Sequence, residues 1–222
     1  METAITIETP SHAVSALLVQ AERPVAAYVL AHGAGAGMRH PFMAQMAAEL
    51  ASAGITTLRY QFPFMEAAVG RPDSPTVAVA TVRAAVARAA DLLPELPLIA
   101  GGKSFGGRMT STAAALSPLE GVRGLVFLGF PLHSPKRPAT ARGDHLDQVT
   151  VPMLFLQGTR DDLADRELMR AVCSRLGAPA TLAEVAEANH GFEVPKRTGR
   201  THADIIAELA QTSAAWIRKV VG

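Results

Sequence analysis

The sequence predicts an α/β fold: a doubly wound, mostly parallel eight-stranded sheet with helices on both faces. Two observations support this. Short apolar runs alternate along the chain with longer stretches of helical periodicity, as in strands joined by crossover helices. The chain has 222 residues, 49% hydrophobic and 18% charged, which suits a globular unit with a sizeable core. We therefore expect residues 1–222 to form a single domain.

Eight apolar runs of strand length mark the predicted sheet. They span Ile5–Ile7, Ala13–Val19, Ala26–Ala31, Ile55–Tyr60, Leu98–Gly101, Gly124–Gly129, Met153–Gln157 and Thr181–Val185. The first two runs have no helix between them, so we expect them to form an antiparallel, hairpin-like start. The later runs are mostly separated by helix-length segments, which favours parallel pairing.

Five segments between the strands have helical periodicity. They are Phe42–Ala53, Thr76–Leu93, Gly107–Leu116, Arg166–Leu176 and Ala203–Val221. Local signals mark several of their ends. Either Ser74 or Thr76 is placed to cap the second segment, because both residue types accept hydrogen bonds from a first helical turn. Gly54 and Gly177 follow the first and fourth segments as C-terminal stops.

Composition argues against several classes of function. The formal net charge is +1 and lysine and arginine form no run, which argues against a nucleic-acid partner. The N-terminal residues lack the regions of a signal peptide, and no stretch of about 18 apolar residues is present to span a membrane. These features predict a soluble cytoplasmic protein. The one cysteine, Cys173, lies in a helix-like segment, where we expect a buried and unreactive thiol.

One pentapeptide identifies a candidate nucleophile. Residues 102–106 read Gly-Lys-Ser-Phe-Gly, directly after the run Leu98–Gly101 and before a helix-like segment. In a Gly-x-Ser-x-Gly sequence at a strand–turn–helix junction, the serine occupies a strained turn that lifts its hydroxyl above the sheet edge. The flanking glycines avoid collisions with neighbouring backbone. The pattern selects Ser104.

A serine hydroxyl needs a base to take its proton and a carboxylate to orient that base. In a doubly wound sheet these side chains meet at the carboxyl ends of the strands. The run Met153–Gln157 leads into Asp161 and Asp162, and the last strand leads into His190. His190 is therefore the predicted base for Ser104, and both aspartates remain candidates for the carboxylate.

The order serine, aspartate, histidine is that of α/β-hydrolases, and the chain resembles this superfamily from about Ala26 to Gly222. It is similar to the small, cap-less branch of dienelactone-hydrolase-like proteins. Three segments resemble a subgroup that includes a testis-expressed protein and a histone-acetyltransferase-complex subunit: Gly102–Arg108 (GKSFGGR), Phe130–His133 (FPLH) and Gly158–Asp161 (GTRD). Dienelactone hydrolases themselves use a cysteine nucleophile, whereas position 104 is serine.

The resemblance implies a serine hydrolase, and a carboxylesterase acting on small soluble esters is the reading that we favour. It selects Asp161 as the carboxylate and leaves Asp162 as a solvated loop residue. An oxyanion hole needs backbone N–H groups directed at the developing charge. One is expected from Phe105. The other is expected from the glycine loop after the third strand, at Ala34 or Gly35.

Two alternatives remain open. Since the subgroup contains a chromatin-complex subunit, the chain is alternatively a non-catalytic interaction module that keeps the fold. Acyl transfer or perhydrolysis would use the same triad. The polar segment Pro131–Thr150 is too short for a cap domain, and we expect a loop there with one helical turn near Asp144–Gln148.

No cofactor is predicted. The glycine loop at 33–37 lacks the last glycine of a dinucleotide fingerprint, because the required position holds Met38. The Gly-Lys-Ser sequence lacks the first glycine of a phosphate-binding P-loop, because that position holds Pro97. No histidine pair has metal-ligand spacing with a third ligand nearby, so no metal site is expected.

Residues near the predicted mouth are candidates for the substrate pocket. Large apolar residues in loops or at strand ends, and one histidine after a strand, form this set: Phe62, Phe130, Leu132, His133 and Phe192. Lys103 and Arg108 flank the nucleophile, and we favour solvated or ion-paired side chains there over contacts with an anionic substrate. Of the other histidines, His32 is expected to shape the oxyanion loop. The rest are expected at the surface: His12, His40, His145 and His202.

Overall fold

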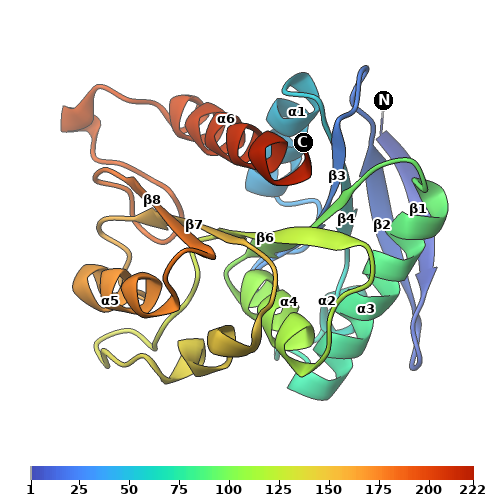
Figure 1. The fold of residues 1–222 in the computed structure, drawn as a ribbon, viewed down its shortest axis with the longest axis horizontal. Helices are drawn as coiled ribbons and strands as arrows, with labels where there is room; N and C mark the ends of the chain where they lie inside the picture. The colour runs from blue at the N-terminus through green and yellow to red at the C-terminus, as the bar shows by residue number, and fades with distance from the viewer. Residues whose placement is uncertain (1) are drawn as a thin grey trace.

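A computed structural model describes residues 2–222 and places one eight-stranded sheet between two layers of helices (Figure 1). The strands are β1 (Glu2–Glu8), β2 (Ala13–Val19), β3 (Ala26–Ala31), β4 (Ile55–Tyr60), β5 (Leu98–Lys103), β6 (Val122–Leu128), β7 (Met153–Gly158) and β8 (Ala180–Val185). Their order across the sheet is β1-β2-β4-β3-β5-β6-β7-β8. β2 pairs antiparallel with β1 and β4, and all other neighbours are parallel. The predicted fold class is confirmed.

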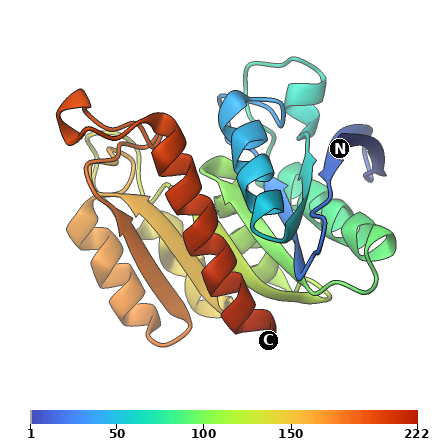
Figure 2. The ribbon, with the colours of Figure 1, turned by 90° about the horizontal axis from the view of Figure 1, so that it is seen from above.

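The helices form the two outer layers. They are α1 (Pro41–Ser52), α2 (Pro63–Glu66), α3 (Pro75–Leu92), α4 (Phe105–Leu116), α5 (Arg166–Leu176) and α6 (His202–Val221), with 3-10 helices η1 (Ala141–Gln148) and η2 (Lys196–Thr198). In Figure 1, α1 and α6 lie on one face of the sheet and α3, α4 and α5 on the other. Figure 2 looks down on the face that carries α1 and α6.

Capping side chains define where several helices begin. The hydroxyl of Ser74, rather than Thr76, accepts the backbone N–H of Val77 at 3.4 Å and caps α3. At α6, Thr201 and Asp204 form a capping box, in which each side chain accepts the backbone N–H of the other residue. These contacts satisfy donors that a helix leaves unpaired at its first turn.

The structure differs from the predicted elements chiefly at β1, α2 and the connection from β6 to β7. β1 is longer than the predicted Ile5–Ile7, because pairing with β2 extends the strand over polar residues. Helix α2 lies where no helix was predicted, since four residues are too few to show periodicity. The connection from β6 to β7 holds the longer η1 in place of the single turn predicted at Asp144–Gln148.

Two apolar cores lie on the two sides of the sheet. On the α1/α6 side, side chains such as Leu30 and Val126 meet Ile206 from α6. On the α3/α4/α5 side, Phe127 packs with Met109 of α4 and other core residues. The central strand β3 is buried along its whole length, as expected for a parallel strand covered by helices on both faces.

The sheet has a topological switch point between β3 and β5. From β3 the chain moves outward to β4, whereas from β5 it proceeds the other way through β6, β7 and β8. The loops that leave the carboxyl ends of β3 and β5 therefore diverge, which opens a crevice at this edge of the sheet. Within residues 2–222, no helix is both long and apolar enough to cross a bilayer.

Candidate active site

Ser104 occupies a strained turn between β5 and α4. Its backbone has φ 50° and ψ −115°, a region that residues with side chains rarely adopt. The surrounding backbone leaves no room for side chains on either side. A Cβ at Gly102 would lie 2.2 Å from the oxygen of Ala31, and one at Gly106 would lie 2.5 Å from the oxygen of His32. Both glycines are thus required sterically.

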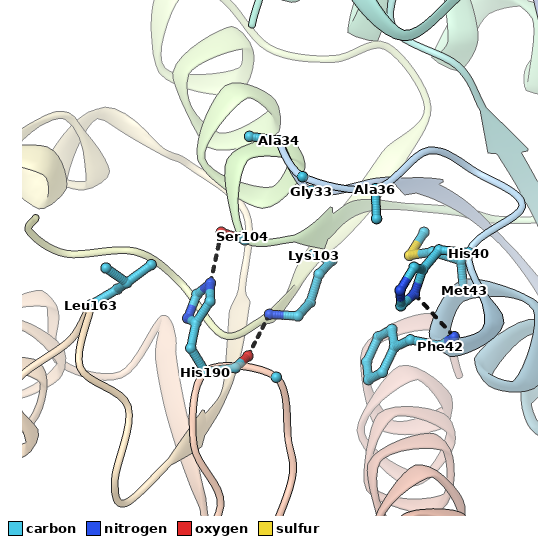
Figure 3. Close-up of a pocket in the computed structure, with 12 residues that line it drawn as sticks. Gly33, Ala34, Ala36, His40, Phe42, Met43, Lys103, Ser104, Leu163 and His190 are labelled. Atoms are coloured by element: carbon cyan, nitrogen blue, oxygen red, sulfur yellow. Dashed lines mark hydrogen bonds between the residues drawn. The ribbon is translucent and has the colours of Figure 1, made fainter. Parts of the chain in front are cut away.

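His190 lies between Ser104 and Asp161. Its Nε2 is 2.9 Å from Ser104 Oγ, and its Nδ1 is 2.8 Å from Asp161 Oδ2. Figure 3 shows the imidazole directed at the serine hydroxyl. The three side chains come from the ends of β5, β7 and β8, so the sheet places them at one edge. They form a continuous hydrogen-bonded chain.

The carboxylate of Asp161 is held by further donors. Its side chain is fully buried, and it accepts hydrogen bonds from Gln157 Nε2 at 2.6 Å and from the backbone N–H of Leu163 at 2.8 Å. Gln157 Oε1 in turn accepts the backbone N–H of Phe130 at 2.9 Å. Asp162 is exposed, so the structure presents Asp161 to His190. The sequence analysis missed Gln157, although it is the one polar residue of an otherwise apolar strand.

His32 fixes the beginning of the glycine loop. Its Nδ1 lies 2.7 Å from the oxygen of Gly33, and its Nε2 accepts the backbone N–H of Phe62 at 3.0 Å. Burial lowers the pKa of His32 to about 4, so the ring is neutral at pH 7. With Nε2 accepting, Nδ1 carries the proton and donates to Gly33. The predicted loop-shaping position of His32 agrees with these contacts.

Two side chains of β4 and its end hold the other end of this loop. The backbone N–H of Met38 donates to Gln61 Oε1 at 2.8 Å, and its oxygen accepts from Arg59 Nη1 at 2.9 Å. Arg59 is buried and is paired with Glu2 of β1. The loop between these anchors carries Ala34 and Gly35, whose backbone N–H groups donate no hydrogen bond to another group of residues 2–222.

A cavity of about 360 Å³ opens beside Ser104. The glycine loop, the start of α1, and the loops after β5, β7 and β8 all contribute residues to it. Its lining residues are Gly33, Ala34, Gly35, Ala36, His40, Phe42, Met43, Lys103, Ser104, Leu163, His190 and Gly191. Most are apolar or glycine. Across residues 2–222, no group of three His, Cys, Asp or Glu side chains is placed to hold a metal ion.

The five residues predicted to line the pocket do not line this cavity: Phe62, Phe130, Leu132, His133 and Phe192. All are buried. Large apolar side chains at strand ends turn into the two cores, where they lose more contact with water than at an open mouth. Phe42 and Met43, which the analysis missed, line the cavity instead.

Three of these residues have well-defined contacts away from the cavity. Phe62 packs edge-on against His32, with ring centroids 5.0 Å apart. Phe192 stacks on Phe42, which lines the cavity, with ring centroids 5.8 Å apart. His133 Nε2 accepts the backbone N–H of Asp165 at 2.7 Å and so links two loops. None of the three lines the cavity.

Two basic side chains, Lys103 and His145, differ from their predicted surroundings, whereas His40 does not. Lys103 is part-buried and donates from Nζ to the backbone oxygen of His190 at 2.7 Å, rather than being solvated or ion-paired. His145, predicted at the surface, is half-buried, with Nε2 2.7 Å from the buried hydroxyl of Ser111. His40 is exposed as predicted, but it lines the cavity. Lys103 and His145 were misplaced because loop and helix docking determines their neighbours.

Comparisons with known proteins agree with the fold. The family model of the alpha/beta hydrolase domain matches residues 24–218. The structure is similar to dienelactone hydrolase from Anabaena variabilis, with a TM-score of 0.79, 20% identity, and 99% of this chain and 98% of that chain covered. It also resembles XC6422 from Xanthomonas campestris, an α/β serine hydrolase without a lid (TM-score 0.74, 22% identity, coverage 97% and 94%).

The esterase domain of a Rhodothermus marinus protein is a third structural relative, with a TM-score of 0.76, 17% identity and full coverage, 100%, of both chains. At these identities the structural likenesses establish the fold. The family match extends over most of the chain, through every strand from β3 to β8. The chain belongs to the α/β-hydrolase domain family.

Proposed function

We propose that the protein is a serine hydrolase, specifically a carboxylesterase that acts on small soluble esters through an acyl-enzyme at Ser104. The observation that carries the proposal is the hydrogen-bonded chain from Ser104 through His190 to Asp161 at the wall of a cavity. Family membership and esterase-like structural relatives support it as well.

In the proposed first half-reaction, Ser104 Oγ attacks the acyl carbon of the ester while His190 Nε2 takes the hydroxyl proton. The distance of 2.9 Å between these atoms is within the reach of a general base. Asp161 accepts a hydrogen bond from Nδ1–H of His190, which keeps Nε2 free to act and stabilises the imidazolium that forms. The imidazolium then protonates the leaving alcohol.

The negative oxygen of the tetrahedral intermediate requires backbone donors. We assign them to the N–H of Phe105, at the first turn of α4, and to that of Ala34 or Gly35. The helix N-terminus adds favourable electrostatics at Phe105. The neutral ring of His32 supports the loop by binding the oxygen of Gly33. In this role His32 acts on the loop and not on the substrate.

The proposed substrate class follows from the cavity. Its volume of about 360 Å³ lies near the lower end of ligand pockets, and its walls at Phe42, Met43 and Leu163 are apolar. The short connection that holds η1 leaves the site without a cap that would enclose a long chain. We therefore expect p-nitrophenyl esters of two to four acyl carbons, roughly, to be hydrolysed faster than long-chain esters.

Substitution of Ser104 tests the proposal. Ser104→Ala should lower the turnover of p-nitrophenyl acetate by about 10⁶-fold, because the nucleophile is lost and only binding and the oxyanion hole remain. Ser111→Ala is a matched control, since Ser111 also contacts a histidine but lies buried between α4 and η1. It should keep turnover within about tenfold of the wild-type value.

A fluorophosphonate probe separates this function from a non-catalytic interaction module. Covalent labelling that depends on Ser104 would support the enzyme, whereas folded wild-type protein that resists the probe would contradict it. Product analysis in the presence of an added alcohol, or of hydrogen peroxide, separates hydrolysis from acyl transfer and perhydrolysis.

A further inference from the structure

Lys103, the residue before Ser104, directs its ammonium group into the site instead of into solvent. Its Nζ donates to the backbone oxygen of His190 at 2.7 Å, a contact drawn in Figure 3. The same nitrogen lies 5.2 Å from the ring centroid of Phe192 and 6.0 Å from that of Phe42. Aromatic faces at these distances attract a cation. Lys103 is thus held by one carbonyl and two rings.

The backbone oxygen of His190 accepts its hydrogen bond from a side chain. On one side Ala188 accepts the backbone N–H of Arg160 at 2.9 Å, and on the same loop Asn189 donates to the oxygen of Glu193 at 3.0 Å. No backbone group of residues 2–222 hydrogen-bonds to the N–H or the oxygen of His190 itself. The donor to that oxygen is the side chain of Lys103.

Ser104 and His190 are therefore joined in two ways. The first is the bond of 2.9 Å between Ser104 Oγ and His190 Nε2. The second runs through the neighbouring Lys103 to the His190 backbone. In an acyl-enzyme the first connection is lost, because Oγ then carries an acyl group in place of its hydrogen. The second remains, since it does not involve Oγ.

In the acyl-enzyme, the contact with Asp161 alone would hold His190 less firmly. Its carboxylate holds Nδ1 and so sets the tautomer of the ring, but it contacts one atom of the residue. Lys103 holds the other end, at the backbone. The two contacts together fix both the position and the direction of Nε2 while Ser104 is acylated. Positioning of this kind is worth as much as 10²-fold, roughly, in rate.

We propose that Lys103 is a positioning residue for deacylation, which holds His190 in place so that Nε2 can accept a proton from the attacking water. The inference rests on the proposed esterase function. The water oxygen bonds to the acyl carbon while its proton passes to Nε2. When the bond between Oγ and the acyl carbon breaks, Oγ takes that proton back, and the carboxylic acid and free Ser104 are released.

The surroundings of Lys103 are consistent with this role. Burial lowers the pKa of Lys103 to about 8, and the negative charge of Asp161 opposes that effect. A Cβ at Gly129 would lie 3.1 Å from Lys103 Nζ, 3.5 Å from His190 Nδ1 and 3.6 Å from Asp161 Oδ2. The three polar side chains thus meet over one glycine. An ammonium withdrawn even partly from water lowers stability unless it is compensated, so its presence at this point favours a functional role.

Pre-steady-state kinetics of Lys103→Met with p-nitrophenyl acetate test the proposal. We expect the burst that reports acylation, and with it kcat/KM, to stay within about threefold of the wild-type value, while kcat and KM both fall by about 10²-fold. Intact-mass spectrometry should show the acetyl-enzyme accumulating during turnover. If the substitution instead disturbed the structure of the whole site, acylation would slow as well and kcat/KM would fall.

Three controls complete the test. Lys219→Met makes the same change at an exposed position of α6 and should alter neither rate. Lys103→Arg keeps a cationic donor and should recover part of the deacylation rate. Lys103→Gln gives a second uncharged variant if Lys103→Met fails to fold, as judged by thermal melting and by the rate of fluorophosphonate labelling.

Two results would overturn the proposal for Lys103: an unchanged kcat in the folded uncharged variants, or a fall in kcat/KM that matches the fall in kcat. Failure of the esterase proposal looks different, because the wild-type protein itself would then give neither a burst nor an acetyl-enzyme.

Discussion

Gln157→Leu should destabilise the protein by removing a bridge between two buried groups. Gln157 is 3% exposed; its amide donates to Asp161 at 2.6 Å and accepts the backbone N–H of Phe130 at 2.9 Å. Leucine fills similar space but leaves that N–H unpaired, which costs about 1–3 kcal/mol. Loss of the charge-assisted bond to the carboxylate adds about 1.5–3 kcal/mol. The expected total is about 4 kcal/mol.

For a chain of this length, about 4 kcal/mol corresponds to a fall in Tm of about 10 °C. Differential scanning calorimetry at pH 7 measures it, without any assumption about enzymatic activity. Gln211→Leu, an exposed position on α6, is the matched control and should change Tm by no more than about 2 °C. If Gln157→Leu also melts within about 2 °C of the wild type, the energetic role assigned to this bridge is wrong.

Three further outcomes are expected. Gly106→Ala should lower the free energy of unfolding measured by urea titration by about 1–3 kcal/mol and reduce esterase activity, because its Cβ meets a backbone oxygen at 2.5 Å. Gly70→Ala, which has open space around it, should change neither quantity. Between about pH 6.5 and about pH 4, the free energy of unfolding should fall by about 3 kcal/mol as pH decreases, because His32 takes up its proton near pH 6.5 in the unfolded chain but only near pH 4 in the folded protein. An equal fall in His32→Gln would contradict this. Met43→Ala should shift the acyl-length preference of p-nitrophenyl esters towards longer chains, since it removes a side chain from the cavity wall, and an unchanged profile would exclude Met43 from that wall.

Strand order was sufficient to place Ser104, His190 and the neighbouring Asp161 and Asp162 at one edge of the sheet, whereas the choice of Asp161 came from the family resemblance. Each residue lies in the turn or loop that follows a strand, and parallel strands bring their carboxyl ends to one edge. The glycine pattern around Ser104 was equally predictable, because it reflects backbone contacts within a few ångströms of the turn. Local sequence and strand order therefore determine much of the geometry of the candidate site.

The cavity lining was not predictable in this way. Phe42 and Met43 reach the site because α1 docks on the sheet at one particular angle, and no local pattern encodes that angle. Phe62 and Phe192 looked equally suitable, since a large apolar residue at a strand end has the same local signature whether it enters a core or lines a mouth. The direction of Lys103 likewise depends on a loop distant in sequence.

The two helical layers divide the site between them. Ser104 begins α4, which packs on one side of the sheet, whereas Phe42 and Met43 belong to the core on the opposite side, with α6. Substitutions in the α1/α6 layer can therefore remodel the cavity wall while the layer beneath the serine stays unchanged. A lineage that keeps this sheet has a route to new substrates in which selectivity diverges while the reacting groups are inherited intact.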